Sequence, residues 1–491
     1  MSHSTRHKRR RSRSNDRFDT QMIANGVLLI LFALLAGIAS YTMYAHNILA
    51  FRHVNVIYTA VLVVVFLVCL LLTLFKKGKH LVTVLLVLFS IVVGVSLFAF
   101  KSLVDVAGNI NKTASYSEIE MKVVVPANSS ISDVSELTNV QAPTSADESN
   151  INALIANIKS EKGVELTVDP VDSYQSAYEN LINGSSQAMV LNSSYSSLLE
   201  LSYNDYESNL KTIYTYKIKK AIEDTAKTTD KNVFNIYISG IDTSGAVSTV
   251  SRSDVNLILT VNMNTHKILM TTTPRDSYVR IPDGGADQYD KLTHAGIYGI
   301  ETSVKTLENL YDIPINYYAR LNFTSFVKLI NALGGVTVYN DQAFTSLHGN
   351  YNFGVGNINL TSGEEALGFV RERYSLEHGD YDRGNNQLKV IQAIVEKLTS
   401  FQSVSNYSDV ISTLQDSIQT NMPLNTMMSL VNEQLDSGKT FIFSSQEVTG
   451  TGSTGQLTSY AMPNASLYMI QLDDASVAKA SQAIKNVMEG K

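Results

Sequence analysis

The sequence predicts three N-terminal transmembrane helices, then a small α/β domain and a larger α/β domain outside the membrane. Three observations predict this fold class. Residues 22–44, 56–75 and 81–100 contain no Asp, Glu, Lys or Arg. Each run is about as long as the roughly 20 residues that a helix needs to cross the hydrocarbon core. After these runs, short β-branched segments alternate with helical stretches, as they do in α/β proteins.

The apolar runs are expected to be helices because lipid offers no hydrogen-bond partners. Every backbone N–H and C=O must therefore be satisfied within the segment. A cleaved signal peptide is not expected, since the first run is too long and two more follow it.

Basic residues indicate the orientation of the spans. The first 21 residues form a tail with seven Lys and Arg, and the loop at 76–80 holds three lysines. The loop between the first two spans holds one charged residue, Arg52. Positive charge marks the cytoplasmic side. We expect a multi-pass protein of the bacterial cell membrane, with a cytoplasmic N-terminus and residues 101–491 extracellular.

The basic tail at 1–21 has two interpretations. In one, the tail sets the topology and rests on anionic lipid headgroups. In the other, it contacts nucleic acid. A tail this short has no room for a helix-turn-helix, so sequence-specific binding is not expected.

The predicted extracellular part is acidic and lacks cysteine. Residues 101–491 hold 28 Lys and Arg against 43 Asp and Glu, a net charge of −15, which does not favour nucleic acid. Cys69, the single cysteine, lies in the second span. No disulfide can therefore stabilise this part, which suits a bacterium without a periplasmic oxidation system.

The smaller domain with its linker is assigned to 118–230, after a juxtamembrane connector at 101–117. Alternating strands and helices predict a small α/β domain, and the polar, helix-prone residues 206–230 suit a connector. Strands are expected at 121–126, 164–168 and 187–191, and helices at 149–159 and 173–182.

The larger domain is assigned to 231–491 and is expected to have α-β-α layers. Its first strands are apolar on both faces, which is typical of central strands covered on both sides. Two further helical segments and a Gly/Thr/Ser-rich loop at 449–456 complete it. Strands are expected at 233–239, 255–261 and 268–273, and helices at 301–310, 323–333, 363–370 and 385–398.

Polar residues cluster where the first strands of the larger domain begin and end. Asp242 follows one strand, and Arg252 and Asp254 precede the next. Ligands of open sheets collect at strand ends. Two carboxylates there suit Mg²⁺, which fills its shell with water and phosphate oxygens. The alternative for Asp242 is an ordinary turn residue.

A second cluster follows the strand that Pro274 ends. Arg275 and Asp276 lie on the loop beyond it, and Arg280 and Lys291 come shortly after. The alternative for Arg275 is a solvated surface side chain.

The third cluster follows a helix predicted to begin at Thr361 or Ser362 with a capping box. Three arginines within 13 residues stand out in this acidic domain. A guanidinium stays charged and matches phosphate oxygens two at a time, which suits a pyrophosphate. The alternative is a salt-bridge network with Glu372, Asp380 and Asp382. The arginines are Arg371, Arg373 and Arg383, with Gln387 one helical turn further on.

These residues, in this order and spacing, resemble the LytR-CpsA-Psr family over about 230–400. The three spans and the extra α/β domain resemble its streptococcal capsule branch, CpsA. The residues that carry the resemblance are Ile238-Ser239-Gly240-Ile241-Asp242, Arg252-Ser253-Asp254, Pro274-Arg275-Asp276, Asp290-Lys291, Glu365-Ala366-Leu367, Arg371, Arg373, Asp380, Arg383 and Gln387.

The resemblance implies a Mg²⁺-dependent phosphotransferase, with Mn²⁺ as an alternative ion and pyrophosphatase side activity. It would move a glycan phosphate, here capsular polysaccharide, from a polyprenyl pyrophosphate carrier to peptidoglycan. Asp242 and Asp254 would hold the metal, and Asp380 is the candidate base. Arg371 and Arg373 are assigned to both catalysis and binding. The expected pyrophosphate ligands are Arg252, Arg275, Arg280, Lys291, Arg371, Arg373, Arg383 and Gln387.

The resemblance also implies an apolar tunnel for the prenyl chain. The doubly apolar strands, with Phe323, Phe326, Leu329 and Ile330, are candidates to line it, or they form plain core. Further expected partners are membrane lipid and other capsule assembly proteins.

Two other functions stay open. One is a membrane-bound regulator of capsule expression, and the other is a non-catalytic module that binds lipid-linked glycan. The missing DNA-reading fold in the tail counts against the first. The paired Asp242 and Asp254 count against the second, because binding alone needs no metal.

Overall fold

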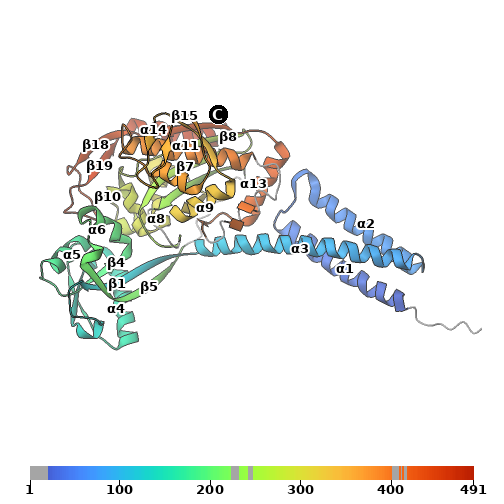
Figure 1. Cartoon of the computed structure of the whole chain (residues 1–491), viewed down its shortest axis with the longest axis horizontal. Coiled ribbons are helices and arrows are strands. Elements are labelled where there is room, and N and C mark those ends of the chain that lie inside the picture. The colour runs from blue at the N-terminus through green and yellow to red at the C-terminus, as the bar shows by residue number, and fades with distance from the viewer. Residues whose placement is uncertain (1–19, 223–231, 242–246, 401–408, 411, 414–416) are drawn as a thin grey trace, which may run out of the picture. The chain divides into compact units, whose positions relative to one another are not determined.

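The structure is a computed structural model of the 491-residue chain, and it describes residues 20–222, 232–241, 247–400, 409–410, 412–413 and 417–491 (Figure 1). The chain divides into two compact units, Met1–Val104 and Asp105–Lys491. The basic tail before Thr20 lies outside the described residues, so both hypotheses about it stay predictions.

The first unit holds three helices that are long and apolar enough to cross a membrane, as predicted. The third continues to Ala114, so most of the expected connector at 101–117 is helical. The helices are α1 (Thr20–Ala45), α2 (Val54–Leu74) and α3 (Lys79–Ala114), with a short 3₁₀ turn, η1 (Phe51–His53), before α2.

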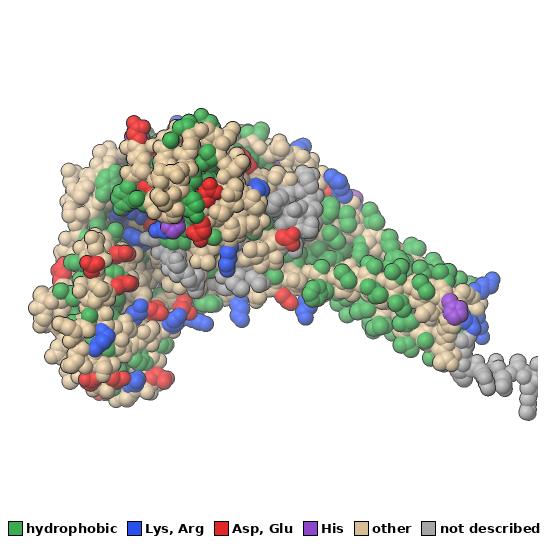
Figure 2. Space-filling view, in the orientation of Figure 1, with side chains coloured by type: hydrophobic (Ala, Val, Ile, Leu, Met, Phe, Trp, Pro, Cys, Tyr) green, Lys and Arg blue, Asp and Glu red, His purple; other side chains and the backbone are tan. Residues whose placement is uncertain are grey.

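A buried polar contact joins α1 to the start of α3. Asn25 Nδ2 donates to the Lys79 carbonyl at 3.0 Å, and Asn25 Oδ1 accepts from Thr83 Oγ1 at 2.7 Å. A polar side chain among apolar helices needs such partners, since lipid supplies none. The outer faces of these helices are covered by hydrophobic side chains (Figure 2).

The second unit begins with a five-stranded sheet in the order β3-β2-β4-β1-β5. Strand β1, between β4 and β5, is antiparallel to both neighbours, whereas β2 is parallel to β3 and β4. The elements are β1 (Tyr116–Pro126), β2 (Asn139–Ala142), α4 (Thr144–Lys162), β3 (Thr167–Pro170), α5 (Tyr174–Ile182), β4 (Met189–Asn192), α6 (Ser196–Ser202) and β5 (Leu210–Ala221).

The prediction of a helix-prone connector at 206–230 was wrong where β5 lies. This strand pairs with the whole of β1, from Leu210 opposite Pro126 to Ala221 opposite Tyr116. Its side chains Ile213 and Ile218 pack against a buried cluster. The lysines between the apolar residues suggest a polar helix, but pairing with β1 decides the conformation, because strand preference depends on neighbours.

The larger sheet has six strands in the order β16-β11-β6-β7-β8-β17. β6 and β11 are parallel, β7 is antiparallel to β6 and β8, and β17 is parallel to β8. The strands are β6 (Val233–Ile241), β7 (Ser253–Asn262), β8 (Lys267–Thr272), β11 (Tyr317–Leu321), β16 (Gln419–Thr420) and β17 (Ile442–Glu447).

Helices cover both faces of this sheet, which confirms the predicted α-β-α layers. One face packs on α8 and α14, and the other packs on α11 and α13. Helices α9 and α10 form a further core with α11. The helices are α7 (Leu292–Ala295), α8 (Ile300–Tyr311), α9 (Phe323–Leu333), α10 (Gly363–Arg371), α11 (Asp380–Thr399), α13 (Leu424–Ser437) and α14 (Asp474–Met488).

Four antiparallel strand pairs surround the layers. One of them corrects the loop predicted at 449–456, because most of this Gly-rich segment forms a strand. The pairs are β9 (Tyr278–Ile281) with β10 (Gln288–Lys291), β12 (Val336–Asn340) with β15 (Gly356–Leu360), β13 (Phe344–Thr345) with β14 (Asn352–Phe353), and β18 (Gly450–Thr454) with β19 (Tyr468–Leu472).

Arg320 on β11 is a buried cation that links the two sheets. Its guanidinium donates to the carbonyls of Val247 and Thr249 at 3.4 and 3.0 Å, and to Gln419 Oε1 at 3.4 Å. The backbone at 248–250 bonds to Glu118 of β1. Burial lowers the pKa of Arg320 to about 10, so the side chain stays charged at neutral pH.

Arg320→Leu should destabilise the protein without touching the candidate site. Buried acceptors would lose their donor, at a cost of roughly 3 kcal/mol. The measurement is thermal unfolding of the purified chain in detergent, with the exposed Arg280→Leu as the matched control. Equal melting temperatures for the two variants would refute the structural role of Arg320.

Candidate active site

A pocket of about 400 Å³ opens where strand ends of the six-stranded sheet meet the first turns of α11. Strands β8 and β17 end at this edge, and the antiparallel β7 begins there. The pair β18–β19 contributes a further wall. The strand-end loops therefore bring side chains from distant parts of the chain around one space, as the sequence predicted. The predicted site residues that line it are Asp254, Arg275, Arg383 and Gln387.

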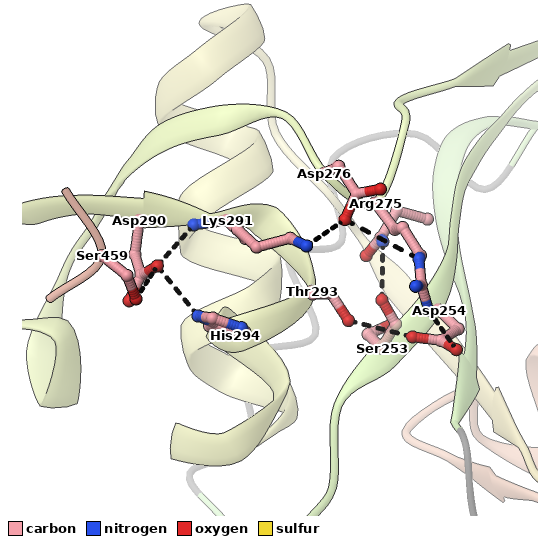
Figure 3. Close-up of polar contacts among 10 residues, drawn as sticks. Ser253, Asp254, Arg275, Asp276, Asp290, Lys291, Thr293, His294 and Ser459 are labelled. Carbon is pink, nitrogen blue, oxygen red and sulfur yellow. Dashed lines mark hydrogen bonds and ion pairs between the residues drawn. The ribbon is translucent and has the colours of Figure 1, made fainter. Parts of the chain in front are cut away.

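Asp254 lies at the start of β7 and is held on both oxygens (Figure 3). Oδ2 accepts from Arg275 Nη1 at 2.7 Å, and Oδ1 accepts from Thr293 Oγ1 at 3.1 Å. Burial opposes ionisation, but the charges of Arg275, Arg252 and Arg383 outweigh it. The pKa of Asp254 is therefore lowered from its usual value.

The backbone before Asp254 is held by a close approach to Gly296. A Cβ atom at Gly296 would come within 2.5 Å of the Ser251 carbonyl oxygen and 2.7 Å of the Ser253 nitrogen. Arg252, in this segment, is buried, and its charge acts on Asp254. Packing against glycine thus positions both predicted residues.

An alternating series of charges extends from Asp254 away from the pocket (Figure 3). Arg275 Nε lies 3.8 Å from Asp276 Oδ1, and Lys291 Nζ lies 2.5 Å from the same oxygen. Lys291 is 7% exposed at its side chain and does not line the described part of the pocket. The structure therefore places this predicted pyrophosphate ligand behind Arg275, paired with Asp276.

Asp290 holds the far end of this series, and the sequence marks it only through the Asp290-Lys291 motif. Its Oδ1 accepts from the Lys291 N–H at 2.7 Å and from Ser459 Oγ at 2.7 Å, and lies 2.8 Å from His294 Nδ1. Oδ2 accepts from the Ala461 N–H at 2.8 Å. Although burial opposes ionisation, His294 and these bonds lower the pKa of Asp290.

The helix before the arginine cluster begins with the predicted cap. Ser362 Oγ accepts from the Glu365 N–H at 3.2 Å, and Glu365 Oε2 accepts from the Thr361 N–H at 2.8 Å. The helix ends at Arg371, and the backbone of Glu372 after it is extended.

The guanidinium groups of Arg371 and Arg373 stack on separate aromatic rings. Arg371 lies 4.3 Å from the Phe323 ring centre, and Arg373 lies 4.5 Å from that of Tyr374. Neither lines the described part of the pocket.

The salt-bridge network proposed as the alternative does not form through Glu372 or Asp382. Glu372 is buried and accepts the backbone N–H groups of residues 347, 373, 374 and 375 at 2.6–3.0 Å. Asp382 accepts from the His378 N–H at 2.9 Å and from Gln342 Nε2 at 2.7 Å. Both carboxylates organise the loop between α10 and α11 rather than bind the arginines.

Helix α11 begins at Asp380, earlier than predicted, and this start places Arg383 and Gln387 on one face. Both line the pocket, and Gln387 Nε2 donates to the Val370 carbonyl at 3.3 Å. The first turns of α11 and the end of α10 are thereby tied together.

Of the predicted residues that remain, one lies away from the pocket and two are not described. Arg280 on β9 is 64% exposed and donates to the Asp287 carbonyl at 3.0 Å. Asp242 and the side chain of Asp380 lie outside the described residues. Their roles as metal ligand and base stay predictions.

Glu447, at the end of β17, is a pocket residue that no sequence motif marks. Its side chain has no hydrogen-bond or ion partner among the described residues, and burial raises its pKa to about 7. Its Oε1 lies 3.9 Å from the Cβ position of Gly384 on α11. Since a single Glu at a strand end has no motif around it, only the fold reveals this carboxyl.

Part of the pocket lining is apolar. It includes Leu257 on β7, Leu388 and Ile391 on α11, and Ile470 on β19. The predicted tunnel residues on α9 are elsewhere, because Leu329 and Ile330 are buried in the core with α10, and Phe323 and Phe326 pack against it. Their alternative reading as core is the one that the structure supports.

The donor set suits a divalent cation only together with substrate oxygens. Among the described residues, no three His, Cys, Asp or Glu side chains form a metal site. Asp254 is the one predicted ligand whose side chain is described. A single carboxylate fits Mg²⁺, which takes one or two carboxylates and completes its shell with water and phosphate oxygens.

Comparison with protein families gives a match over more than half of the chain. Residues 200–476 match the model of the LytR_cpsA_psr family. A second model, a DNA polymerase processivity factor, matches residues 76–191, less than a quarter of the chain. That match begins before α3 and ends in β4, and it does not establish that family.

The curated relatives include transferases of cell-wall polymers. The chain is 33% identical over 282 residues to the polyisoprenyl-teichoic acid–peptidoglycan teichoic acid transferase TagU of Enterococcus faecalis, covering 56% of this chain and 87% of the relative. It is 35% identical over 232 residues to TagU of Oceanobacillus iheyensis, covering 46% and 69%.

Solved structures also match this chain. B. subtilis TagU is 28% identical and matches 53% of this chain and 98% of its own, with a TM-score of 0.41. TagT bound to LIIa-WTA is 28% identical and matches 54% and 96%, with a TM-score of 0.44. The family-model match and the curated relatives establish that this chain belongs to the LytR_cpsA_psr family.

Proposed function

We propose that this protein is a phosphotransferase that moves a capsular glycan phosphate from a polyprenyl pyrophosphate carrier to peptidoglycan, at the outer face of the cell membrane. The observation that carries the proposal is the pocket itself, where Asp254, Arg275 and Arg383 stand beside the apolar Leu388 and Ile391. Charge suits a pyrophosphate, and the apolar wall suits prenyl carbon. The curated relatives, which transfer teichoic acid to peptidoglycan, support this reaction class.

The arginines would act on charge that develops during transfer. The acceptor hydroxyl oxygen forms a bond to the glycan phosphorus, and the bridging P–O bond breaks, so that prenyl monophosphate leaves. Negative charge grows on the leaving and transferred groups. Fixed guanidinium groups stabilise this state more than the ground state. The hydroxyl proton passes to a base, for which Asp380 is the candidate.

Asp254, with Asp242, would hold Mg²⁺ against the pyrophosphate oxygens. The cation supplies charge neutralisation for the breaking bond. The pair of Asp254 with Arg275 keeps the carboxylate ionised and fixed in direction before any cation binds.

Asp254→Asn and Arg383→Ala should each lower Mg²⁺-dependent release of prenyl monophosphate. Loss of one charge-stabilising group costs roughly 100- to 1000-fold in rate. The assay uses the purified chain in detergent, a glycan-linked prenyl pyrophosphate and Mg²⁺, and it includes Arg371→Ala. Full turnover in all three variants would reject the proposed site.

Lys291→Met and Arg280→Met should behave differently, although both were predicted pyrophosphate ligands. Without Lys291, Asp276 would be free to draw Arg275 away from Asp254, so affinity for prenyl pyrophosphate should fall roughly tenfold. Arg280 is exposed and paired with Asp287, so its variant should bind normally. Lys291→Arg keeps a cation beside the buried Asp276 and should therefore retain affinity for prenyl pyrophosphate. Equal losses of affinity in Lys291→Met and Arg280→Met would contradict the placement of Lys291 behind Arg275.

Donor affinity should fall as the pH rises through about 7, because Glu447 then ionises in the pocket. An anionic donor with an apolar chain favours the neutral carboxyl, so binding takes up a proton above this pH. Glu447→Gln should remove this part of the dependence, roughly threefold to tenfold between about pH 6 and pH 8. Asp254, His378, Tyr381 and Tyr468 also line the pocket and remain in the variant, so the difference isolates Glu447. A full pH dependence in the variant would contradict the expectation.

A further inference from the structure

Exposure divides the lining of the pocket into a floor and a rim. The floor is half-buried and includes the charged residues Asp254, Arg275 and Arg383. The exposed lining residues form the rim, which carries no Asp, Glu, Lys or Arg in the described structure. The rim consists of His378, Tyr381, Thr449, Gly450 and Tyr468.

Tyr468 is held across the strand pair β18–β19 by a glycine. It lies opposite Thr454, two pairs along from Gly452 and Ile470. A Cβ atom at Gly452 would come within 2.1 Å of the Tyr468 hydroxyl oxygen, so the ring occupies the space that a side chain there would fill. The ring is nevertheless 48% exposed, which leaves it open to a ligand.

Tyr381 comes from a different element and faces the same pocket. It lies in the first turn of α11, two residues before Arg383, and is 56% exposed. Within the described residues, neither its hydroxyl nor that of Tyr468 has a hydrogen-bond partner. Two aromatic faces with available hydroxyls therefore border the charged floor.

We propose that Tyr381 and Tyr468 form a subsite for a pyranose ring next to the phosphate-binding floor. A pyranose has apolar C–H faces and a polar edge, and a tyrosine offers an apolar ring with a hydroxyl at its end. Within the described residues the rim carries no Lys or Arg that would hold a second strong anion. A sugar bonded to the phosphate would leave the charged floor across this rim. The proposal rests on the proposed function and assigns the residues that recognise its carbohydrate.

The ring belongs either to the glycan of the donor or to the acceptor. A donor sugar would make Tyr381 and Tyr468 contribute to donor affinity. An acceptor sugar would make them contribute to the acceptor KM, with donor affinity unchanged. Both cases use the same stacking chemistry. Donor affinity and the acceptor KM, measured separately, distinguish them.

The experiment measures the full chain in detergent with two probes, a prenyl pyrophosphate and the same molecule bearing one N-acetylhexosamine. For Tyr381→Ala and Tyr468→Ala we expect unchanged affinity for the sugar-free probe. Affinity for the sugar-bearing probe, or the KM for a peptidoglycan fragment, should worsen roughly threefold to tenfold. Tyr→Phe variants should retain most of the stacking effect. Tyr339→Ala, at an exposed tyrosine of β12 outside the pocket lining, is the matched control.

Two results would overturn the subsite. One is normal binding of both probes with a normal acceptor KM in the double Tyr→Ala variant. The other is an equal loss for both probes, which would place the tyrosines in phosphate or lipid binding. Failure of the proposed function looks different, since the wild-type chain would then bind neither probe.

Discussion

Asp254 and Arg275 meet at the edge of the large sheet, and their ion pair determines how the surrounding charges are arranged. Arg275 also approaches Asp276, which binds Lys291, whose backbone is bound by Asp290. Each charge has an opposite neighbour, and an unpaired buried charge would cost several kcal/mol. The members of the series therefore hold one another in place. Arg275 is fixed before a ligand arrives, as electrostatic catalysis requires.

The loop between α10 and α11 is organised by different means. Glu372 binds four backbone N–H groups, and Asp382 binds the backbone of His378. Because these carboxylates are engaged with the backbone, they do not neutralise Arg371 and Arg373, which stack on aromatic rings. Among the described residues, no carboxylate pairs with either guanidinium, although the domain as a whole is acidic.

Much of the fold could be predicted because the relevant signals are local. The helix expected at 323–333 has those bounds, and the three strands that are apolar on both faces are central in the sheet. Strand β5 was missed, since its alternation of lysines with apolar residues resembles a polar helix until β1 pairs with it. Strand β18 was missed because its Gly-rich sequence has little intrinsic strand preference.

The sequence alone determined the three apolar spans, the acidic second unit and the family motif, since hydropathy, charge and spacing are properties of neighbouring residues. Only the tertiary structure decided which side chains meet. It joined Asp254, Arg275, Arg383 and Gln387 in one pocket and left Lys291 behind Arg275 and Arg280 exposed. It also brought Glu447 and Tyr468 to the same space. No local pattern predicts these neighbours, because the pocket is created where strand ends and a helix from distant segments pack together.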